Sequence, residues 1–521
     1  METWFFLTIT LFLSILIKLT FDLLFKSPSV PSTNLPPGPR PMSLVDSLRF
    51  IRRGTETEKI LKSLKAKFGP LVTLQFGRRR KAIFIFDREL AHQALVTNGA
   101  VFADRPQQTA TGKIASSDQH SINSAGYGAT WRLLRRNLTA EIMHPARVRA
   151  FGHARRWVLD ILVGRLGAEA GAGNGEVKVI DHFHYAMFSL LTLMCFGDKL
   201  DEKQIKQIET VHRQLLLSTR RFEILNFMPK LSKILFYRRW AEFYSMRKQQ
   251  ADVVIPLVNA RKNHATIGQT EAGSTNEADP HVTAYVDTLL ALEFQEGGTK
   301  RKLTEEEFVT LCSEFINAGT DTTSTALQWI MANVVKYPEI QAKLIEELKS
   351  FIDPSADEVK EEELSKLHYV KAVVLEGLRR DPPGHFVLPH AVTEETELGG
   401  YHIPKDAIIN FMVAEIGRDP EVWEDPLEFR PERFLEGEGG KAVEVDITGT
   451  REIKMMPFGV GRRICPGLGL ATLHLEYFVA NLVWKFEWKA VDEVNLEEKT
   501  EFTIVMKHPL RARITERVNK T

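Results

Sequence analysis

The feature that most constrains the fold is a glycine-rich loop with a single cysteine, PFGVGRRICPG at residues 457–467. Gly459 and Gly461 permit positive φ angles, so the backbone can approach a flat partner closely. An apolar stretch at residues 468–486 predicts a helix directly after the loop. Cys465 then lies at a helix N-terminus, where the dipole favours an anion and we expect a thiolate. A thiolate is a ligand for iron, and a haem held by cysteine is electron-rich and poised for O–O cleavage.

The loop resembles the signature of the cytochrome P-450 family, whose members are haem-thiolate monooxygenases. The pattern Phe-x-x-Gly-x-Arg-x-Cys-x-Gly is matched by Phe458, Gly461, Arg463, Cys465 and Gly467. The resemblance implies that haem b (iron protoporphyrin IX) binds here. Cys465 would be the axial iron ligand, Phe458 would pack near the sulfur, and Arg463 would pair with a haem propionate. Without the other matches, a lone cysteine in a glycine-rich turn would be interpreted as a buried structural residue.

The resemblance covers nearly the whole chain and implies a fold that is mainly α with small β-sheets (α+β). In this fold the haem lies between a long central helix and the helix that follows the Cys loop. The chain would divide into an N-terminal membrane anchor (1–26), a proline-rich hinge (27–45) and a haem-binding catalytic domain (46–521).

The predicted anchor depends on an almost wholly apolar stretch from Trp4 to Phe25. At about 1.5 Å per residue, a helix of this length crosses a bilayer core of ~30 Å. A cleaved signal peptide is the alternative, but a basic n-region and a clear cleavage site are missing. Lys26 follows the stretch and weakly favours a cytosolic position for the rest of the chain. We therefore expect a protein of the endoplasmic reticulum membrane in contact with lipid.

The second landmark is a long helix predicted over residues 304–336. Thr304 and Glu307 form a capping box at its start, and Pro338 follows its end. At about 1.5 Å per residue, such a helix is ~50 Å long and crosses a whole domain.

The centre of this helix, residues 318–323, has the sequence AGTDTT. A glycine and three threonines weaken a helix, so a local kink is expected there. The segment matches the family pattern Ala/Gly-Gly-x-Asp/Glu-Thr-Thr/Ser. The resemblance implies that Ala318 contacts the haem and that Asp321 and Thr322 are catalytic, because they hydrogen-bond activated oxygen and relay protons to it. A polar kink in a core helix is the alternative.

Trp131 and Arg135 lie four residues apart on another predicted helix, so both side chains project from one face. They match the family's Trp-x-x-x-Arg, whose side chains bind a haem propionate, and arginine suits a carboxylate as a fork-shaped donor. The alternative is a basic surface helix. A weaker hypothesis directs Arg132 and Arg136 towards an acidic redox partner.

Glu376 and Arg379 lie three residues apart on a helix predicted over residues 366–380. With Arg433 of the later Pro-Glu-Arg-Phe segment, they match a buried ion triad that braces the haem-binding core in the resembled family. One position departs from the family. Many members have histidine where this chain has Asp381, which leaves a contact supplied there in doubt.

Two apolar segments correspond to the edges of the family's substrate pocket. The first segment, residues 385–390, is expected to be a strand and contributes Phe386, Val387 and Leu388. The second contributes Thr503 and Ile504 from a turn near the C-terminus. Burial in the core of a sheet is an equally good interpretation of both.

The net charge, the cysteine count and the missing motifs exclude several classes of function. A net charge of +1 gives no overall field for binding nucleic acid. Three cysteines cannot form a disulfide framework, and no Cys-x-x-Cys suggests zinc. No Gly-x-Gly-x-x-Gly opens a βαβ unit and no flavin domain is present, so electrons have to come from another protein.

The leading interpretation is a membrane-anchored monooxygenase, most like plant microsomal members of the family. It would insert one oxygen atom from O2 into a small lipophilic or amphipathic metabolite, with NADPH electrons delivered by a separate NADPH-cytochrome reductase. One alternative is an O2-independent haem-thiolate isomerase or dehydratase, which commonly lacks the acid–alcohol pair or has an altered Cys loop. Another is a non-enzymatic haem or gas-binding protein.

Overall fold

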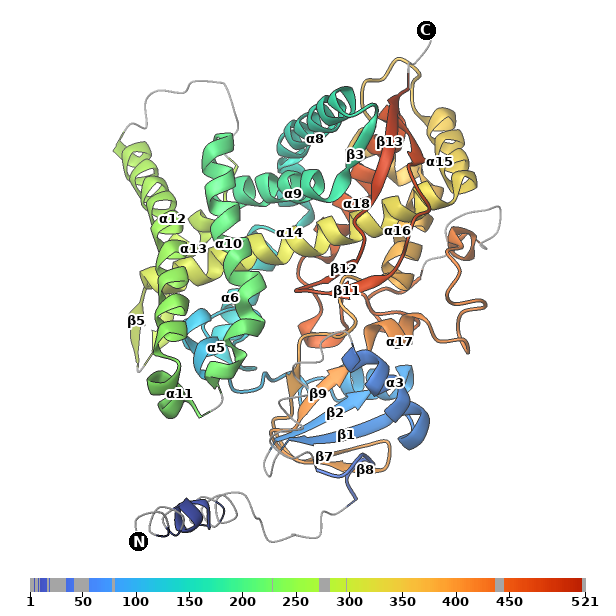
Figure 1. Cartoon of the computed structure of the whole chain (residues 1–521). Helices are drawn as coiled ribbons and strands as arrows, with labels where there is room; N and C mark the ends of the chain where they lie inside the picture. Colours follow the sequence, from blue (N-terminus) through green and yellow to red (C-terminus); the bar gives the residue numbers. More distant parts are fainter. Residues whose placement is uncertain are drawn as a thin grey trace. The chain divides into compact units, whose positions relative to one another are not determined.

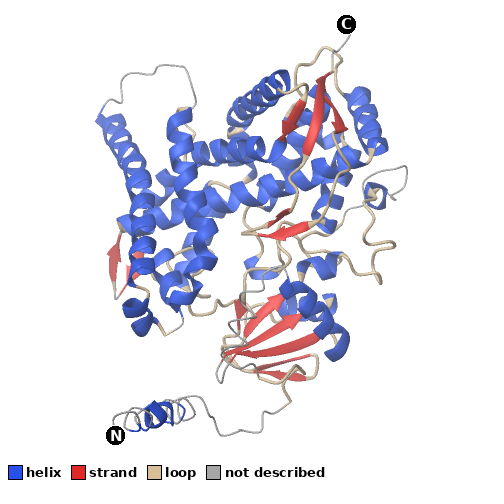
Figure 2. Cartoon of the chain, in the orientation of Figure 1, coloured by secondary structure: helices blue, strands red, loops and turns tan. Residues whose placement is uncertain are grey.

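The computed structural model describes residues 34–41, 56–76, 80–226, 228–270, 282–296, 298–435 and 445–517, together with residues 4, 8, 10–15 and 18. Most of these residues are in helices, and the strands form several small sheets (Figure 2). The prediction of a mainly α fold with small β-sheets is therefore confirmed. The chain forms two compact units, one from Met1–Pro106 with Leu388–Met412 and one from Gln107–Val387 with Val413–Thr521.

The first unit is built on a four-stranded sheet in the order β1-β2-β9-β6. β1 and β2 are antiparallel, β2 and β9 are parallel, and β9 and β6 are antiparallel. Strands β7 and β8 form a separate antiparallel hairpin. The strands are β1 (Leu71–Phe76), β2 (Arg80–Ile85), β6 (His390–Ala391), β7 (Thr396–Leu398), β8 (Tyr401–Ile403) and β9 (Ile408–Phe411), and the helices are α3 (Glu56–Phe68), α4 (Arg88–His92) and the π-helix η1 (Gln93–Thr97).

The described part of the predicted hinge lies on this sheet. The backbone N–H of Thr73 in β1 donates to the Pro37 carbonyl at 2.8 Å. A Cβ atom on Gly38 would lie 1.9 Å from the Thr73 carbonyl oxygen, so only glycine fits at this approach. The proline-rich segment is therefore held against β1 by the backbone.

The predicted membrane anchor, residues 1–26, lies for the most part outside the described residues. Those that are described (4, 8, 10–15 and 18) are helical and exposed. Trp4, Leu11 and Phe12 are among the most exposed large apolar side chains.

The second unit is organised around helix α14 (Glu305–Lys336), which runs through its middle (Figure 1). The predicted capping box is confirmed, because Thr304 Oγ1 accepts from the Glu307 N–H and the Glu307 carboxylate accepts from the Thr304 N–H. The helix is uninterrupted through residues 318–323. α14 packs against α9 (Val179–Phe196) and α18 (Leu468–Lys485), and most of its residues are buried.

Helix α9 is the one described helix that is long and apolar enough to cross a membrane. Of its residues, 89% are buried inside the protein, so it is a core helix of the second unit.

The other elements of this unit surround α14. The α-helices are α5 (Ala110–Ala115), α6 (Ala129–Glu141), α7 (Pro145–Ala150), α8 (Gly152–Ala172), α10 (Glu202–Phe222), α11 (Pro229–Leu235), α12 (Tyr237–Thr270), α13 (Tyr285–Leu290), α15 (Pro338–Phe351), α16 (His368–Arg380) and α17 (Val413–Gly417). The 3₁₀-helices are η2 (Glu223–Asn226), η3 (Glu361–Lys366), η4 (Pro431–Phe434) and η6 (Gly461–Arg463). The strands are β3 (Glu176–Lys178), β4 (Phe294–Glu296), β5 (Thr299–Arg301), β10 (Phe486–Ala490), β11 (Glu498–Thr500), β12 (Ile504–Met506) and β13 (Arg511–Glu516).

Candidate functional site

The cysteine loop is shaped by its glycines. Gly459 and Gly461 have φ angles of 69° and 76°, as the sequence predicts. The loop turns back on itself, because the Cys465 N–H donates to the Phe458 carbonyl at 2.9 Å. Helix α18 begins at Leu468, directly after the loop. Cys465 itself is partly exposed.

The electrostatics of the cysteine differ from the expectation of a free thiolate. Burial raises the pKa of the Cys465 thiol above its ordinary value. The backbone N–H of Gly467 and the guanidinium of Arg135 lower this pKa, but by less. The helix N-terminus alone therefore does not ionise the sulfur. A metal ion bonded to a thiol deprotonates it, so this sulfur suits a ligand that binds together with its cation.

Helix α6 supplies two groups that suit an anionic ligand. Burial lowers the pKa of Arg135, and its guanidinium has no hydrogen bond or carboxylate partner among the described residues. Trp131 on the same face is 7% exposed, and its indole N–H has no hydrogen bond within the described part of the chain. A half-buried cation without a partner is costly, so the site favours a carboxylate from outside the chain.

Arg463 differs from Arg135 because protein atoms already contact it. It donates to the carbonyls of Ala125 (2.7 Å) and Ile122 (3.3 Å), and its guanidinium carbon lies 4.4 Å from the centre of the Trp131 ring. Arg463 thus joins the cysteine loop to the segment that precedes α6.

The centre of α14 has an exposed residue, although most residues of the helix are buried. Ala318 is exposed, while its neighbours in the same helix pack against α9. A Cβ on Gly319 would lie 2.7 Å from Leu191 Cδ1 in α9, so glycine is needed for this packing. The Thr322 hydroxyl donates to the Ala318 carbonyl at 2.6 Å. The Asp321 carboxylate instead faces α9, where Oδ1 lies 3.5 Å from His184 Nε2.

These residues fit a haem. The second unit offers the partly exposed Cys465, the Arg135 guanidinium and the Trp131 indole N–H without hydrogen-bond partners in the described residues, and the small exposed Ala318 on the central helix. A soft thiolate donor selects iron or another soft metal ion, and the two N–H donors suit a propionate. All of the predicted haem-binding residues belong to this unit: Trp131, Arg135, Ala318, Phe458, Arg463, Cys465 and Gly467.

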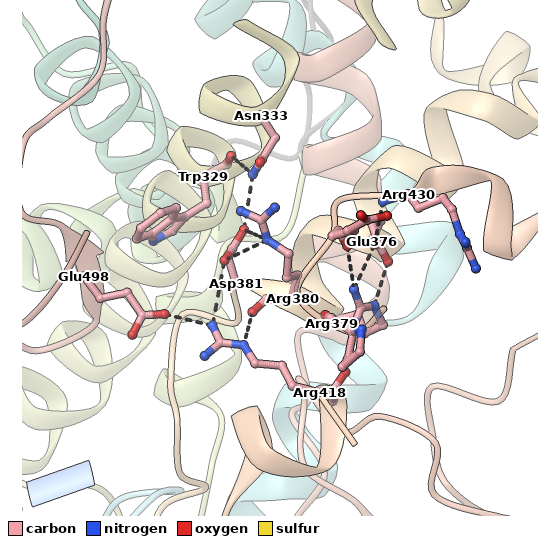
Figure 3. A network of polar contacts seen from close by, with 12 residues as sticks. Trp329, Asn333, Glu376, Arg379, Arg380, Asp381, Arg418, Arg430 and Glu498 are labelled. Carbon is pink, nitrogen blue, oxygen red and sulfur yellow. Dashed lines mark hydrogen bonds and ion pairs between the residues drawn. The ribbon is translucent and has the colours of Figure 1, made fainter. Parts of the chain in front are cut away.

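The structure brings Glu376 and Arg379 together in a buried cluster (Figure 3). Arg433 also pairs with Glu376. Arg379 donates to both oxygens of the Glu376 carboxylate, at 2.7 and 2.8 Å. Arg433 Nε and the Arg430 N–H donate to Glu376 Oε1 at 3.2 and 2.8 Å. The Arg379 guanidinium also donates to backbone carbonyls of Gly417, Pro426 and Glu428, so this cluster fixes the chain that leads to the cysteine loop.

Asp381, where the sequence departs from the family, lies in a second buried network (Figure 3). Its carboxylate accepts from Arg380 Nε at 3.1 Å and from Asn333 Nδ2 of α14 at 3.2 Å. Arg418 lies 3.8 Å from it and also pairs with Glu498 at 2.8 Å. Asp381 therefore binds cations that a neutral histidine would not bind.

Glu498 is the outer member of this network. Burial by itself would raise its pKa, but His385 and Arg418 outweigh burial and lower the pKa to about 2. Asp381 and Glu498 thus flank Arg418 and connect the end of α16 to β11.

The predicted pocket residues have different environments. Residues 385–389 form a loop and not the expected strand, since β6 begins only at His390. Val387 lies against the cysteine loop, because a Cβ on Gly459 would be 3.6 Å from its side chain. Phe386 is half-buried, and Leu388 is exposed and belongs to the first unit.

Thr503 and Ile504 are buried against the central helix. The Thr503 hydroxyl lies 2.9 Å from that of Thr325, and Trp329 Nε1 donates to the Ile504 carbonyl at 2.7 Å. The segment that carries them is thereby fixed to α14.

Sequence reasoning missed His184 on α9, which lies beside Asp321 of the central helix, and Glu209 on α10, which contacts His184. Neither residue belongs to a recognisable motif. The one available signal was the presence of polar residues in the otherwise apolar stretch of residues 179–196.

Comparisons with known proteins agree with this site. The family model for cytochrome P450 matches residues 36–515. A protein of Arabidopsis thaliana named cytochrome P450 89A9 is 49% identical, over 98% of this chain and 99% of its own length. Tabersonine 16-hydroxylase 2 of Catharanthus roseus is 30% identical over 89% of this chain and 88% of its own length. A solved zebrafish cytochrome P450 structure with progesterone has a TM-score of 0.71 at 20% identity, and covers 88% of this chain and 99% of its own.

Proposed function

Because this chain belongs to the cytochrome P450 family of monooxygenases, we propose that it is a membrane-anchored haem-thiolate enzyme that oxidises a small lipophilic or amphipathic metabolite. One oxygen atom of O2 enters the product, and a separate reductase supplies electrons from NADPH. The observation that carries the proposal is the partly exposed residue Cys465, whose thiol feels the charge of the Arg135 guanidinium. Arg135 has no carboxylate partner among the described residues.

When bound, the haem supplies the activation of dioxygen. Cys465 would be its iron ligand, and the Gly467 N–H that donates to the sulfur would temper the charge on it. Phe458 would cover the sulfur. Arg135 and the Trp131 indole would bind a propionate, while Arg463 would hold Trp131 in place.

Protons would be managed at the centre of α14. Thr322 would turn its hydroxyl, which now donates to Ala318 O, towards oxygen bound at the exposed side of the helix. Asp321 would supply protons as the positioned acid next to it. Both roles are proposed because these residues lie within one helical turn of the exposed Ala318.

The proposed substrate class is supported by the relatives and by the apolar residues near the loop. Relatives at 28–30% identity are named for flavonoids, isoflavones and the alkaloid tabersonine, which are polycyclic and partly aromatic. Val387, Phe386 and Ile504 are apolar, and a mostly apolar pocket binds such molecules. Thr503 would give the pocket a hydroxyl.

An N-terminal anchor in the endoplasmic reticulum membrane is supported by the exposed Trp4, Leu11 and Phe12. Exposed apolar side chains on a helix favour burial in lipid. The anchor (1–26) and hinge (27–45) would place the haem-binding domain (46–521) in the cytosol beside an NADPH-cytochrome reductase.

The proposal is tested with the full-length protein in lipid nanodiscs with a purified NADPH-cytochrome reductase. Flavonoids, isoflavones and indole alkaloids are first titrated into the ferric protein, and a shift of the Soret band towards high spin identifies ligands. Binders are then incubated with NADPH and ¹⁸O2. We expect a product that contains one ¹⁸O atom and depends on both the reductase and NADPH.

Two results would overturn the proposal. Conversion of a substrate without O2 or reductase would identify an isomerase or dehydratase. A stable carbon monoxide complex with no product from any binder would identify a haem or gas-binding protein. Thr322→Ala serves as a matched variant, since it should lower product yield without changing ligand binding.

A further inference from the structure

Helix α9 places one histidine between two carboxylates. Nδ1 of His184 lies 2.7 Å from Glu209 Oε1 on α10, and Nε2 lies 3.5 Å from Asp321 Oδ1 on α14. The imidazole is 5% exposed, whereas the Glu209 and Asp321 side chains are 20% and 14% exposed. The three residues are distant in sequence and meet because α9 packs on both helices.

The charges around His184 favour the imidazolium form. Burial would lower the pKa of His184, but the carboxylates of Asp321 and Glu209 outweigh burial and raise the pKa above its usual value. Arg213 of α10 opposes them at longer range. In the described part of the chain, Glu209, Asp321 and Arg213 are the charged groups that shift the pKa of His184. The imidazolium hydrogen-bonds Glu209 and pairs with Asp321 by charge at 3.5 Å, where Nε2 makes no hydrogen bond to a described residue.

We propose that His184 is a positioning residue, an imidazolium that Glu209 holds in place and that fixes the Asp321 carboxylate on the α9 side of the central helix. The proposal deepens the proposed function, because it rests on Asp321 as the acid beside Thr322. His184 does not touch the substrate or the haem site in this role. It acts through Asp321.

The consequence concerns where protons are held. Asp321 is adjacent to Thr322, whose hydroxyl donates to the Ala318 carbonyl and not to Asp321. With His184 present, the Asp321 carboxylate has a defined position and an adjacent N–H. Without it, the carboxylate is freed to rotate, and an acid that is misplaced by about 1 Å loses much of its effect.

His212 provides a matched control. Like His184, it is a buried histidine, but it lies on α10. Its Nδ1 is 2.9 Å from Ile208 O, and its Nε2 is 3.0 Å from Ser313 Oγ on α14. Burial lowers the pKa of His212 to about 4, so it is neutral. These two hydrogen bonds involve no carboxylate. Replacing His212 therefore perturbs helix packing against α14 without touching Asp321.

The first test measures His184 itself and needs no turnover. The holoprotein is labelled with ¹³C-histidine, and its NMR resonances are followed from pH 5.5 to 8.5, with His184→Gln assigning the signal. We expect the pKa of His184 to lie above about 6.5. It should fall in Glu209→Gln and in Asp321→Asn, and stay unchanged in His212→Gln. A value at or below 6.5, or one that neither amide variant changes, overturns the proposal.

The second test is a double-mutant cycle in the reconstituted enzyme. His184→Gln should lower kcat about tenfold, as loss of a positioning partner commonly does, with KM unchanged and more hydrogen peroxide released per NADPH. Added to Asp321→Asn, it should cause no further loss, because both changes act through one carboxylate. A merely structural histidine would instead give an additive loss, as His212→Gln would.

The two failures can be told apart. If the wild-type protein forms no oxygenated product, the proposed function fails, whatever the variants do. If product forms but the losses are additive, or Glu209→Gln leaves kcat and the peroxide ratio unchanged, the role of His184 fails alone. Glu209→Gln keeps His184 in place and so remains informative if His184→Gln does not fold.

Discussion

The guanidinium carbon of Arg463 lies 4.4 Å from the centre of the Trp131 ring, so the cysteine loop and helix α6 are joined by a cation–π contact. Arg463 also donates to the carbonyls of Ile122 and Ala125. This arginine is therefore already engaged, and Arg135 is the guanidinium that an incoming carboxylate would pair with. The two arginines of the predicted haem site have different roles.

Arg135→Gln is expected to weaken haem binding. A charge-assisted hydrogen bond contributes about 1.5–3 kcal/mol, so the rate of haem transfer to a haem-scavenging protein should rise at least about tenfold. Arg136→Gln on the same helix is the control, because Arg136 is exposed. Equal rates for both variants would show that Arg135 does not bind the haem.

Glu376→Ala is expected to abolish haem-loaded protein. It leaves Arg379 and Arg433 buried without their carboxylate, which costs about 3–5 kcal/mol. Glu424→Gln, in the same part of the chain, breaks only an exposed pair with Arg430 and should leave haem content normal. The measurement is haem per polypeptide after purification. Normal haem content in Glu376→Ala would refute the bracing role.

Gly319→Ala is expected to destabilise the protein although alanine is the better helix former by about 1 kcal/mol. The new methyl group would overlap Leu191 in α9, and overpacking costs about 1–3 kcal/mol. Gly164→Ala in α8 is the control, since a Cβ there meets nothing within 4 Å and should stabilise the helix. Denaturant unfolding distinguishes them. The double variant Gly319→Ala/Leu191→Ala should lose less unfolding free energy than the sum of the losses in the two single variants.

Glu476→Gln is expected to raise stability at pH 8 and not at pH 4. Burial raises the pKa of Glu476 to about 7, and Lys371 only partly offsets this. The favourable protonated state is complete below the unfolded pKa of about 4.5 and is lost as the pH rises through about 7. The partly exposed position limits the gain at pH 8 to about 2 kcal/mol. Thermal melts at both pH values, with the exposed Glu493→Gln as control, test this. A gain of equal size at both would contradict it.

Local sequence rules predicted those parts of the site that lie within one segment. The φ angles of Gly459 and Gly461, the capping box at Thr304 and the i, i+3 spacing of Glu376 and Arg379 depend on neighbours in the chain. Each follows from glycine freedom or helix periodicity.

Properties that depend on packing between distant segments were not predictable. His184 meets Glu209 and Asp321 only because three helices pack together. The cation-rich environment of Asp381 is formed by Arg380 and by Arg418 from beyond the β6–β9 segment. The prediction of a Cys465 thiolate considered the helix dipole but not desolvation, which has the largest effect on the pKa of this thiol. The loop at 385–389 has apolar residues typical of a strand, but among the described residues it forms only an isolated bridge at Phe386.

The most direct test of the haem-thiolate assignment is the absorption spectrum of the ferrous protein with carbon monoxide. The wild-type protein should show the strongly red-shifted Soret band that a thiolate ligand produces, and Cys465→Ala should lack it. Cys195→Ala and Cys312→Ala, which alter buried cysteines on α9 and α14, should keep it. A red-shifted band that survives in Cys465→Ala, or that disappears only in one of the other two variants, would contradict the assignment of Cys465 as the iron ligand.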